Sequence, residues 1–86
     1  MKFKNTLSEY TEYEFRILIE EILQVNGTEK YQDELIIHFR FLVKDVGGAD
    51  LIFYPEPGAD ISAEGIINTV KARCEAKGLR SFKPRL

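Results

Sequence analysis

Residues 50–55, Asp-Leu-Ile-Phe-Tyr-Pro, place four large apolar or aromatic side chains in a row between strong helix breakers. Gly47 and Gly48 free the backbone before this stretch, and Pro55 cannot continue a helix after it. The pattern predicts a single helical turn with Asp50 as its N-cap. One turn is too short to be stable alone, so the rest of the fold must support it.

A single turn has two faces, which leaves two interpretations of its side chains. In the first, Leu51 and Ile52 anchor the turn to a core. Phe53 and Tyr54 then lie partly outside, with the Asp50 carboxylate at their edge, as in many protein-binding hot spots. In the second, both aromatic rings belong to the core.

The first long helix is predicted from a capping box. The Thr11 hydroxyl and the Glu14 carboxylate can each accept an unpaired backbone N–H at its start. Asn26 and Gly27 tolerate positive φ and are expected to end the helix. Its apolar stripe is expected to be Phe15, Leu18, Ile19 and Ile22, with Val25 as an extension.

The second helix should be capped by Thr28 and run to about Lys44. Its buried stripe is expected to be Leu35, Phe39, Leu42 and Val43, with Tyr31 or His38 at the margin. Ile36, Ile37 and Phe41 exceed what one stripe requires, because successive residues on a helix lie about 100° apart. Ile36 is then either part of a broad core stripe or a residue that faces a partner.

The last helix is predicted between Ser62, as its N-cap, and Lys77–Gly78, as its stop. Its buried side is expected to be Ile66, Ile67, Val70 and Cys74, and its outer side Asn68, Lys71, Arg73 and Glu75. Before the helices Leu7 and Tyr10 should act as anchors, and after them Leu79 and Phe82 should fold back onto the core. The caps on both sides favour helix over strand for residues 35–37, so we expect an all-α fold.

Size and composition limit the class of protein. A chain of 86 residues is expected to form a single domain, 1–86. The net charge of −2 argues against direct nucleic-acid binding, which needs a basic face. No apolar run reaches the roughly 18 residues of a membrane span, and a single cysteine excludes an internal disulfide. We therefore expect a cytoplasmic protein that does not bind membranes.

Acidic residues are concentrated early in the chain and basic residues in its last 16 positions. This asymmetry suggests a partner with a positive surface, although solvated helix faces also explain many such charges.

Catalytic chemistry is not expected, because the sequence lacks a convincing nucleophile with its base, a metal-ligand spacing or a carboxylate pair. His38 is expected to be a half-buried residue at a helix margin, and Cys74 a small core residue. Gly47 and Gly48 lack the lysine of a phosphate-binding loop and are expected to act as a hinge. The sequence therefore predicts no enzyme, no metal and no cofactor.

Several segments, in order over nearly the whole chain, carry a resemblance to a known family. They are Ser8–Glu12 with Glu14 and Phe15, His38–Phe39, Asp50–Pro55, Gly65–Lys71, Lys77–Gly78 and Phe82–Lys83. Together they resemble the immunity proteins of E-type colicins and S-type pyocins. The Asp-Leu-Ile-aromatic-Tyr-Pro block is the most specific of these segments.

The resemblance implies a distorted antiparallel four-helix bundle with a short third helix. It implies a protein that binds the cognate nuclease domain of a bacteriocin at an exosite next to the active site, protects the producing cell, and is a monomer or weak dimer when free. The third helix would supply a shared hot spot of Asp50, Phe53, Tyr54 and Pro55. The residues that select the cognate toxin would include Leu23, Gln32, Asp33, Ile36 and Arg40.

Two positions depart from the family pattern. Phe53 stands where tyrosine is usual, so it has no hydroxyl to donate. Arg40 stands where members specific for DNases often carry an acid, and a cation would need a carboxylate on the toxin. A ribonuclease, or a DNase with an altered exosite, is therefore as credible a target as an ordinary HNH-type DNase. Two further alternatives remain: immunity to a contact-delivered nuclease toxin, and self-association of the chain through its exposed aromatic patch.

Overall fold

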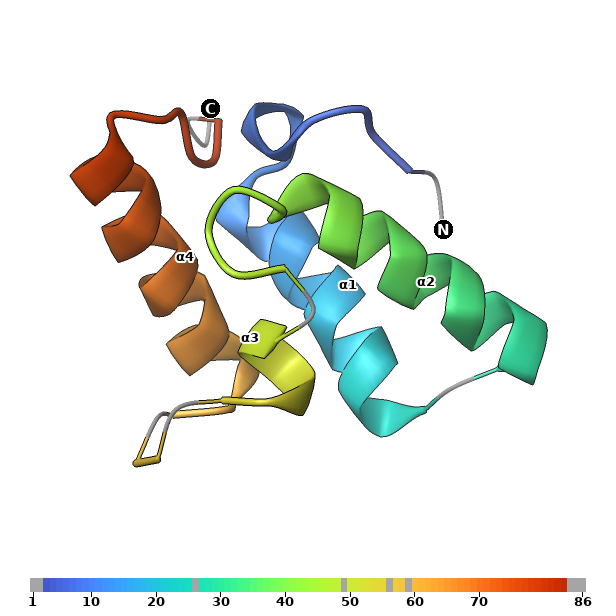
Figure 1. The fold of residues 1–86 in the computed structure, drawn as a ribbon. Coiled ribbons are helices and arrows are strands. Elements are labelled where there is room, and N and C mark those ends of the chain that lie inside the picture. The colour runs from blue at the N-terminus through green and yellow to red at the C-terminus, as the bar shows by residue number, and fades with distance from the viewer. Residues whose placement is uncertain (1–2, 26, 49, 56, 59, 84–86) are drawn as a thin grey trace.

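The structure is a computed structural model that describes residues 3–25, 27–48, 50–55, 57–58 and 60–83. These residues form a 3₁₀ turn, η1 (Leu7–Glu9), and four α-helices, with no strand among them. The helices are α1 (Glu12–Gln24), α2 (Glu29–Leu42), α3 (Asp50–Phe53) and α4 (Ala63–Lys77) (Figure 1). The expected all-α fold with a short third helix is confirmed.

The three long helices begin where their capping residues predicted. Thr11 accepts the Glu14 N–H at 3.2 Å, and the Glu14 carboxylate accepts the Thr11 N–H at 2.9 Å, which completes the capping box. Thr28 caps α2 and Ser62 caps α4 through their side-chain oxygens. Each cap satisfies a backbone donor that the helix itself cannot pair.

The helix ends follow the sequence less closely. Val25 does not extend the stripe of α1: it adopts the left-handed conformation at φ 54° and is 71% exposed. Asn26, which was expected to help end this helix, lies outside the described residues. Helix α2 ends at Leu42, two residues before the expected end, whereas α4 ends at Lys77 with Gly78 in the left-handed conformation, as expected.

The core lies where α1 packs between α2 and α4 (Figure 1). Two ion pairs show that α1 and α4 run antiparallel: Glu12 of α1 pairs with Lys71 at 2.5 Å, and Arg16, one turn further along α1, pairs with Glu64, which lies earlier in α4. Each long helix buries the stripe expected of it: Phe15, Leu18, Ile19 and Ile22; Leu35, Phe39 and Leu42, followed by Val43; and Ile66, Ile67, Val70 and Cys74. Full burial of one such side chain contributes about 1.5–3 kcal/mol.

The segments before α1 and after α4 close one end of the bundle. Tyr10 and Leu7 are buried as expected, and the Lys83 N–H donates to the Tyr10 carbonyl at 2.9 Å. Phe82 packs its ring 5.1 Å from that of Phe15, which confirms that it folds back. Leu79 does not: it is 42% exposed, because the left-handed turn after α4 ties its N–H to the Cys74 carbonyl.

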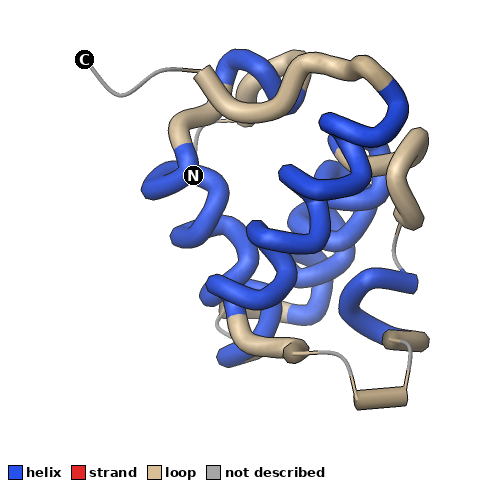
Figure 2. The backbone as a smooth tube through the Cα atoms, turned by 90° about the vertical axis from the view of Figure 1, so that its left-hand side faces the viewer, coloured by secondary structure: helices blue, strands red, loops and turns tan. Residues whose placement is uncertain are grey.

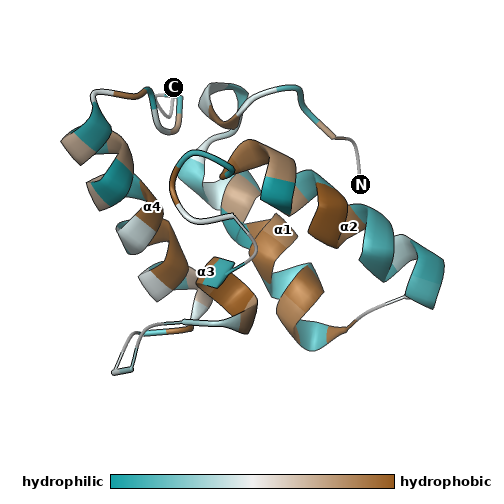
Figure 3. Ribbon diagram, in the orientation of Figure 1, coloured by the Kyte–Doolittle hydropathy of each residue, from teal (hydrophilic) through white to brown (hydrophobic). Residues whose placement is uncertain are grey.

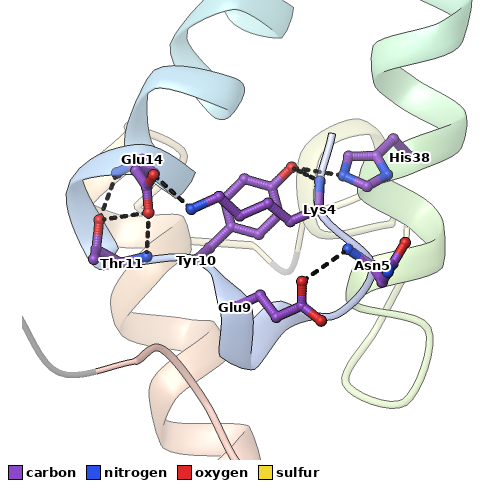
Figure 4. A network of polar contacts seen from close by, with 7 residues as sticks. All are labelled: Lys4, Asn5, Glu9, Tyr10, Thr11, Glu14 and His38. Carbon is purple, nitrogen blue, oxygen red and sulfur yellow. Dashed lines mark hydrogen bonds and ion pairs between the residues drawn. The ribbon is translucent and has the colours of Figure 1, made fainter. Parts of the chain in front are cut away.

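A polar network links α2 to the segment before α1 (Figure 4). The Tyr10 hydroxyl accepts the Lys4 N–H at 3.1 Å and is hydrogen-bonded to Nε2 of His38 at 2.7 Å. His38 is half-buried, as expected, and burial lowers the pKa of its imidazole. At about 100° per residue, Ile36 and Arg40 lie on the side of α2 opposite His38, so this contact turns them away from Tyr10.

Candidate functional site

Helix α3 is one turn of helix with a buried and an exposed side, set apart from the three long helices (Figure 2). Asp50 is its first residue and not its N-cap: the carbonyl of Asp50 accepts the Tyr54 N–H at 3.0 Å, which closes the turn. Leu51 is buried, and Ile52 packs against the core. Phe53 is 48% exposed and Tyr54 79% exposed. The interpretation that left both rings partly outside is therefore confirmed.

The loop before α3 depends on two glycines with positive φ. Gly47 has φ 136° and Gly48 φ 59°, and the Gly48 N–H donates to the Val43 carbonyl at 2.9 Å. A Cβ on Gly47 would lie 2.8 Å from Nη1 of Arg73 and 3.0 Å from Leu51, so only glycine fits without displacement. Gly47 is therefore closely packed on its Cβ side, whereas a Cβ on Gly48 would meet no atom within 4 Å; the expectation that the pair acts as a hinge stays a prediction.

Two cations of α4 hold this loop. Arg73 donates through Nη1 to the Val46 carbonyl at 2.8 Å, and Lys77 donates to the Asp45 carbonyl at 2.6 Å. Arg73 was expected on the outer side of the last helix, but it is half-buried over the loop. Sequence reasoning missed this role, because the hydrogen bond joins residues 27 positions apart and no local pattern marks it.

A groove of about 820 Å³ runs between α2 and α3. It is lined by Ile36, Ile37, Arg40, Phe41, Lys44, Gly47, Gly48, Asp50 and Phe53, and we call it the α2–α3 groove. It joins Asp50 and Phe53 to Ile36 and Arg40, so residues predicted separately on two helices form one surface.

A smaller hollow of about 270 Å³ lies on the other side of α3, facing α4. Tyr54 and Pro55 line it together with Ile66, Thr69 and Arg73, among others. Asp50 lines both the groove and this hollow. Helix α3 is therefore a ridge between two depressions, with one ring directed to each.

The residues predicted to select a toxin do not all lie on this surface. Asp33 and Arg40 are exposed and Leu23 is 41% exposed, whereas Ile36 is half-buried against the core. Gln32 is 7% exposed, since its amide donates to the Glu21 carbonyl at 3.1 Å. The expectation that Gln32 faces outward is wrong, because it pairs a backbone carbonyl near the end of α1.

Two apolar residues of α2 that were not in the predicted set are also exposed. Ile37 is 62% exposed and Phe41 53% exposed, and both line the α2–α3 groove. The sequence showed that α2 carries surplus apolar side chains but not which of them face out. That choice follows from the rotation of the helix.

Cys74 and His38, the two residues considered as a nucleophile or base, are both part of the folded core or its margin. Cys74 is buried, and burial, followed by the charge of Asp45, raises the pKa of its thiol. His38 is engaged with Tyr10. Among the described residues, no cluster of His, Cys, Asp or Glu could hold a metal ion, and no helix is long and apolar enough to cross a membrane.

Comparisons with known proteins agree with this geometry. The family model for colicin immunity protein / pyocin immunity protein matches residues 7–73. The pyocin-S1 immunity protein of Pseudomonas aeruginosa is 34% identical over 84 residues, which cover 93% of this chain and 97% of that protein. The similarity therefore extends well beyond α3 alone.

Two solved structures contain chains with the same fold. One is the crystal structure of the pyocin AP41 DNase–immunity complex, with a TM-score of 0.84, 39% identity, and coverage of 100% of this chain and 99% of that chain. The other is the mutant nuclease domain of pyocin S8 with its cognate immunity protein, with a TM-score of 0.83, 32% identity, and coverage of 94% and 100%. The architecture of the bundle is thus shared over its length.

Proposed function

Since this chain belongs to the colicin and pyocin immunity protein family, we propose that it binds and inhibits the nuclease domain of a bacteriocin, beside the active site of that domain. The observation that carries this proposal is the continuous surface formed by the exposed rings of α3 and the α2–α3 groove. Aromatic side chains held on a rigid support lose little entropy on binding. The surface is therefore suited to a tight protein contact.

Each part of the surface has a distinct role in the proposal. Phe53 and Tyr54 exclude water from the centre of the contact, and Asp50, placed between two depressions, pairs with a basic group or backbone N–H of the nuclease. Arg40 lines the groove beside this centre, Asp33 and Leu23 are exposed elsewhere on α2 and α1, and in this proposal the three discriminate among toxins by attraction and by clash. Inhibition needs no chemistry from this chain, only bulk and negative potential against nucleic acid.

A DNase domain is the better-supported partner. The pyocin AP41 complex contains a DNase with a chain of the same fold, which favours DNA over RNA as the substrate of the toxin. We place the encounter in the cytoplasm of the producing cell, before the toxin is released.

The direct test takes the C-terminal domain of the protein encoded by the neighbouring upstream reading frame as the candidate nuclease. We expect an equimolar amount of this chain to abolish cleavage of plasmid DNA by that domain, with pancreatic DNase as a control that it leaves active. Full cleavage at a tenfold excess of this chain would contradict the proposal.

Self-association is the alternative that the same exposed rings allow. Light scattering at micromolar concentration distinguishes self-association from nuclease binding, because an immunity protein should be a monomer or weak dimer until the nuclease is added. A stable dimer that dissociates on Tyr54→Ala would favour self-association.

A further inference from the structure

Burial of apolar surface does not by itself fix the orientation of α3. Three of its four residues are apolar, and Figure 3 shows the turn as hydrophobic after its first residue. Leu51 and Ile52 lie in or against the core, yet Phe53 is 48% exposed. The hydrophobic effect is not directional, so it cannot select which of these apolar side chains faces solvent. The orientation of the turn therefore requires contacts with a fixed geometry.

Arg73 of α4 supplies one such contact before α3. Its Nη1 donates to the carbonyl of Val46, four residues before the turn begins, at 2.8 Å. A hydrogen bond from a charged donor is both strong and directional. The same Nη1 and the side chain of Leu51 lie against Gly47, where an added Cβ would be 2.8 Å and 3.0 Å from them. The guanidinium, the loop and the buried residue of α3 therefore pack against one another.

Gly65 of α4 supplies a second contact, on the chain after α3. Gly65 is buried, and a Cβ on it would overlap the carbonyl oxygen and the side chain of Asp60. Asp60 is also tied to the start of α4, because its carboxylate accepts the Ser62 N–H at 2.9 Å. Only glycine permits so close an approach of the two backbones. The absent side chain of Gly65 therefore lets the loop after α3 lie directly on α4.

Both contacts come from α4, and they lie on the two sides of α3 along the chain. Asp60 and Arg73 line the hollow of about 270 Å³ beside α3, and Tyr54 and Pro55 line the same hollow. A helix of one turn cannot maintain its own conformation, whereas α4 has 15 residues and is capped at both ends. Helix α4 therefore supports the turn that carries the exposed rings.

We propose that Arg73 and Gly65 are positioning residues for nuclease binding, which hold the rings of α3 in their binding orientation. This inference rests on the proposed function and adds two residues of α4 that set its affinity through α3. A turn that is already fixed in the free protein loses little conformational entropy when it binds. Loosening either contact therefore weakens binding, even though the rings themselves are unchanged.

The affinity test compares three variants of α4 against the candidate nuclease domain. Arg73→Met removes the donor but keeps an unbranched side chain, and Arg73→Lys restores a donor. Lys77→Met is the matched control, because Lys77 also donates to this loop, at the Asp45 carbonyl, but from an exposed position. We expect Kd to rise at least about tenfold for Arg73→Met, and less than about threefold for Arg73→Lys and for Lys77→Met. A wild-type Kd for Arg73→Met, or no rescue by Arg73→Lys, would overturn the role of Arg73.

A double-mutant cycle with Tyr54→Ala separates positioning from a general loss of stability. If Arg73 acts by placing this ring, the two substitutions remove the same interaction and their effects are not additive. We expect Arg73→Met to raise Kd by a smaller factor in the Tyr54→Ala background than in the wild type. Equal factors in the two backgrounds would contradict positioning of the ring by Arg73.

A third measurement needs no nuclease and so separates this inference from the proposed function. Amide hydrogen exchange is followed in the free ¹⁵N-labelled protein, where the Tyr54 N–H donates to the Asp50 carbonyl and closes the turn. We expect exchange at Tyr54 to be at least about fivefold faster in Arg73→Met and in Gly65→Ala, with a smaller change at Ile19 in the middle of α1.

Gly65→Ala provides an internal control in this experiment. Alanine favours a helix more than glycine does, so faster exchange at Tyr54 in this variant cannot come from a weaker α4. It would come from the displaced loop at Asp60. Unchanged exchange at Tyr54 in either variant would overturn the role of the substituted residue, whatever the nuclease result.

Discussion

Helix α1 contributes mainly to the stability of the fold, whereas α3 carries the surface proposed to bind the nuclease. Helix α1 has 13 residues, a complete capping box and four side chains that are at most 5% exposed. Helix α3 has four residues, of which only Leu51 is buried, and its aromatic rings face solvent. A single turn cannot be stable alone. Its conformation therefore depends on neighbours: Leu51 and Ile52 anchor it to the core, and the Arg73 hydrogen bond holds the loop before it.

The exposed residues of α3 can therefore be substituted with little loss of folding stability, whereas the residues that hold α3 in place cannot. Substitutions on the exposed side of α3 should alter binding without altering the free energy of unfolding. Substitutions in α1 should do the reverse, and those beneath α3 should affect both.

The largest expected effect is that of Phe15→Ala in α1. Phe15 is fully buried and contacts the rings of Tyr10, Phe39 and Phe82, so its removal leaves a cavity. We expect the free energy of unfolding to fall by about 3–5 kcal/mol, measured by urea denaturation. A loss below about 1 kcal/mol would remove α1 from its role as the stabilising helix.

Tyr54→Ala should show the opposite behaviour. We expect a loss of at least about 2 kcal/mol in affinity for the nuclease domain, by calorimetry, because a hot-spot ring is lost. Stability should change by less than about 0.5 kcal/mol, since Tyr54 is 79% exposed. Tyr13→Ala is the matched control, because Tyr13 is 58% exposed on α1 and lines neither the groove nor the hollow beside α3. An affinity change below twofold for Tyr54→Ala would exclude this ring as a hot spot.

Gly47→Ala tests whether α3 must be held in place. The new Cβ would meet Arg73 and Leu51 at positive φ, so we expect a stability loss of about 1–3 kcal/mol together with weaker nuclease binding. Gly48→Ala is the control: it also has positive φ, but its Cβ would meet no atom within 4 Å. Equal nuclease affinity of the two variants, measured by calorimetry, would indicate that α3 recovers its position when it binds.

The smallest effect should come from pH. The pKa of folded His38 lies below the ordinary value of 6.5, so below that pH the unfolded chain binds this proton more readily than the folded chain. The free energy of unfolding should therefore decrease as pH falls from 7 through 6.5 toward the folded pKa, and His38→Gln should flatten this slope. The Glu14 carboxylate, whose pKa is lowered to about 2 by Lys4 and then by Thr11, acts in a separate window between pH 4.5 and 2. An unchanged slope between pH 7 and 5 in His38→Gln would assign the effect to other groups.

Part of the candidate site could be predicted because it depends on local chemistry. Residues 50–55 carry their own breakers and four large side chains, which restricts them to one turn with two sides. Their exposure did not follow from the sequence, which also allowed both rings to lie in the core; the structure decides it, with Phe53 48% and Tyr54 79% exposed. The resemblance added the roles of Asp50, Tyr54 and Pro55, which remain predictions until binding is measured.

The sequence by itself determined where the long helices begin and which stripe each of them buries. A cap and an apolar stripe both act within a few residues, so the signals are complete in a short window. The helix ends were less certain, because several residues near a C-terminus can adopt the left-handed conformation that ends a helix. Val25 does so in α1.

Only the tertiary structure decided which distant groups the side chains of α2 and α4 meet and how α3 is held. The Gln32 side chain is buried where its amide donates to the Glu21 carbonyl. The Arg73 side chain lies over the loop where it donates to the Val46 carbonyl. His38 met Tyr10 from another segment, and Ile37 and Phe41, on a different side of α2, line the groove with α3. Each of these contacts joins residues at least 11 positions apart. They exist only once the bundle has packed, so no local pattern could have revealed them.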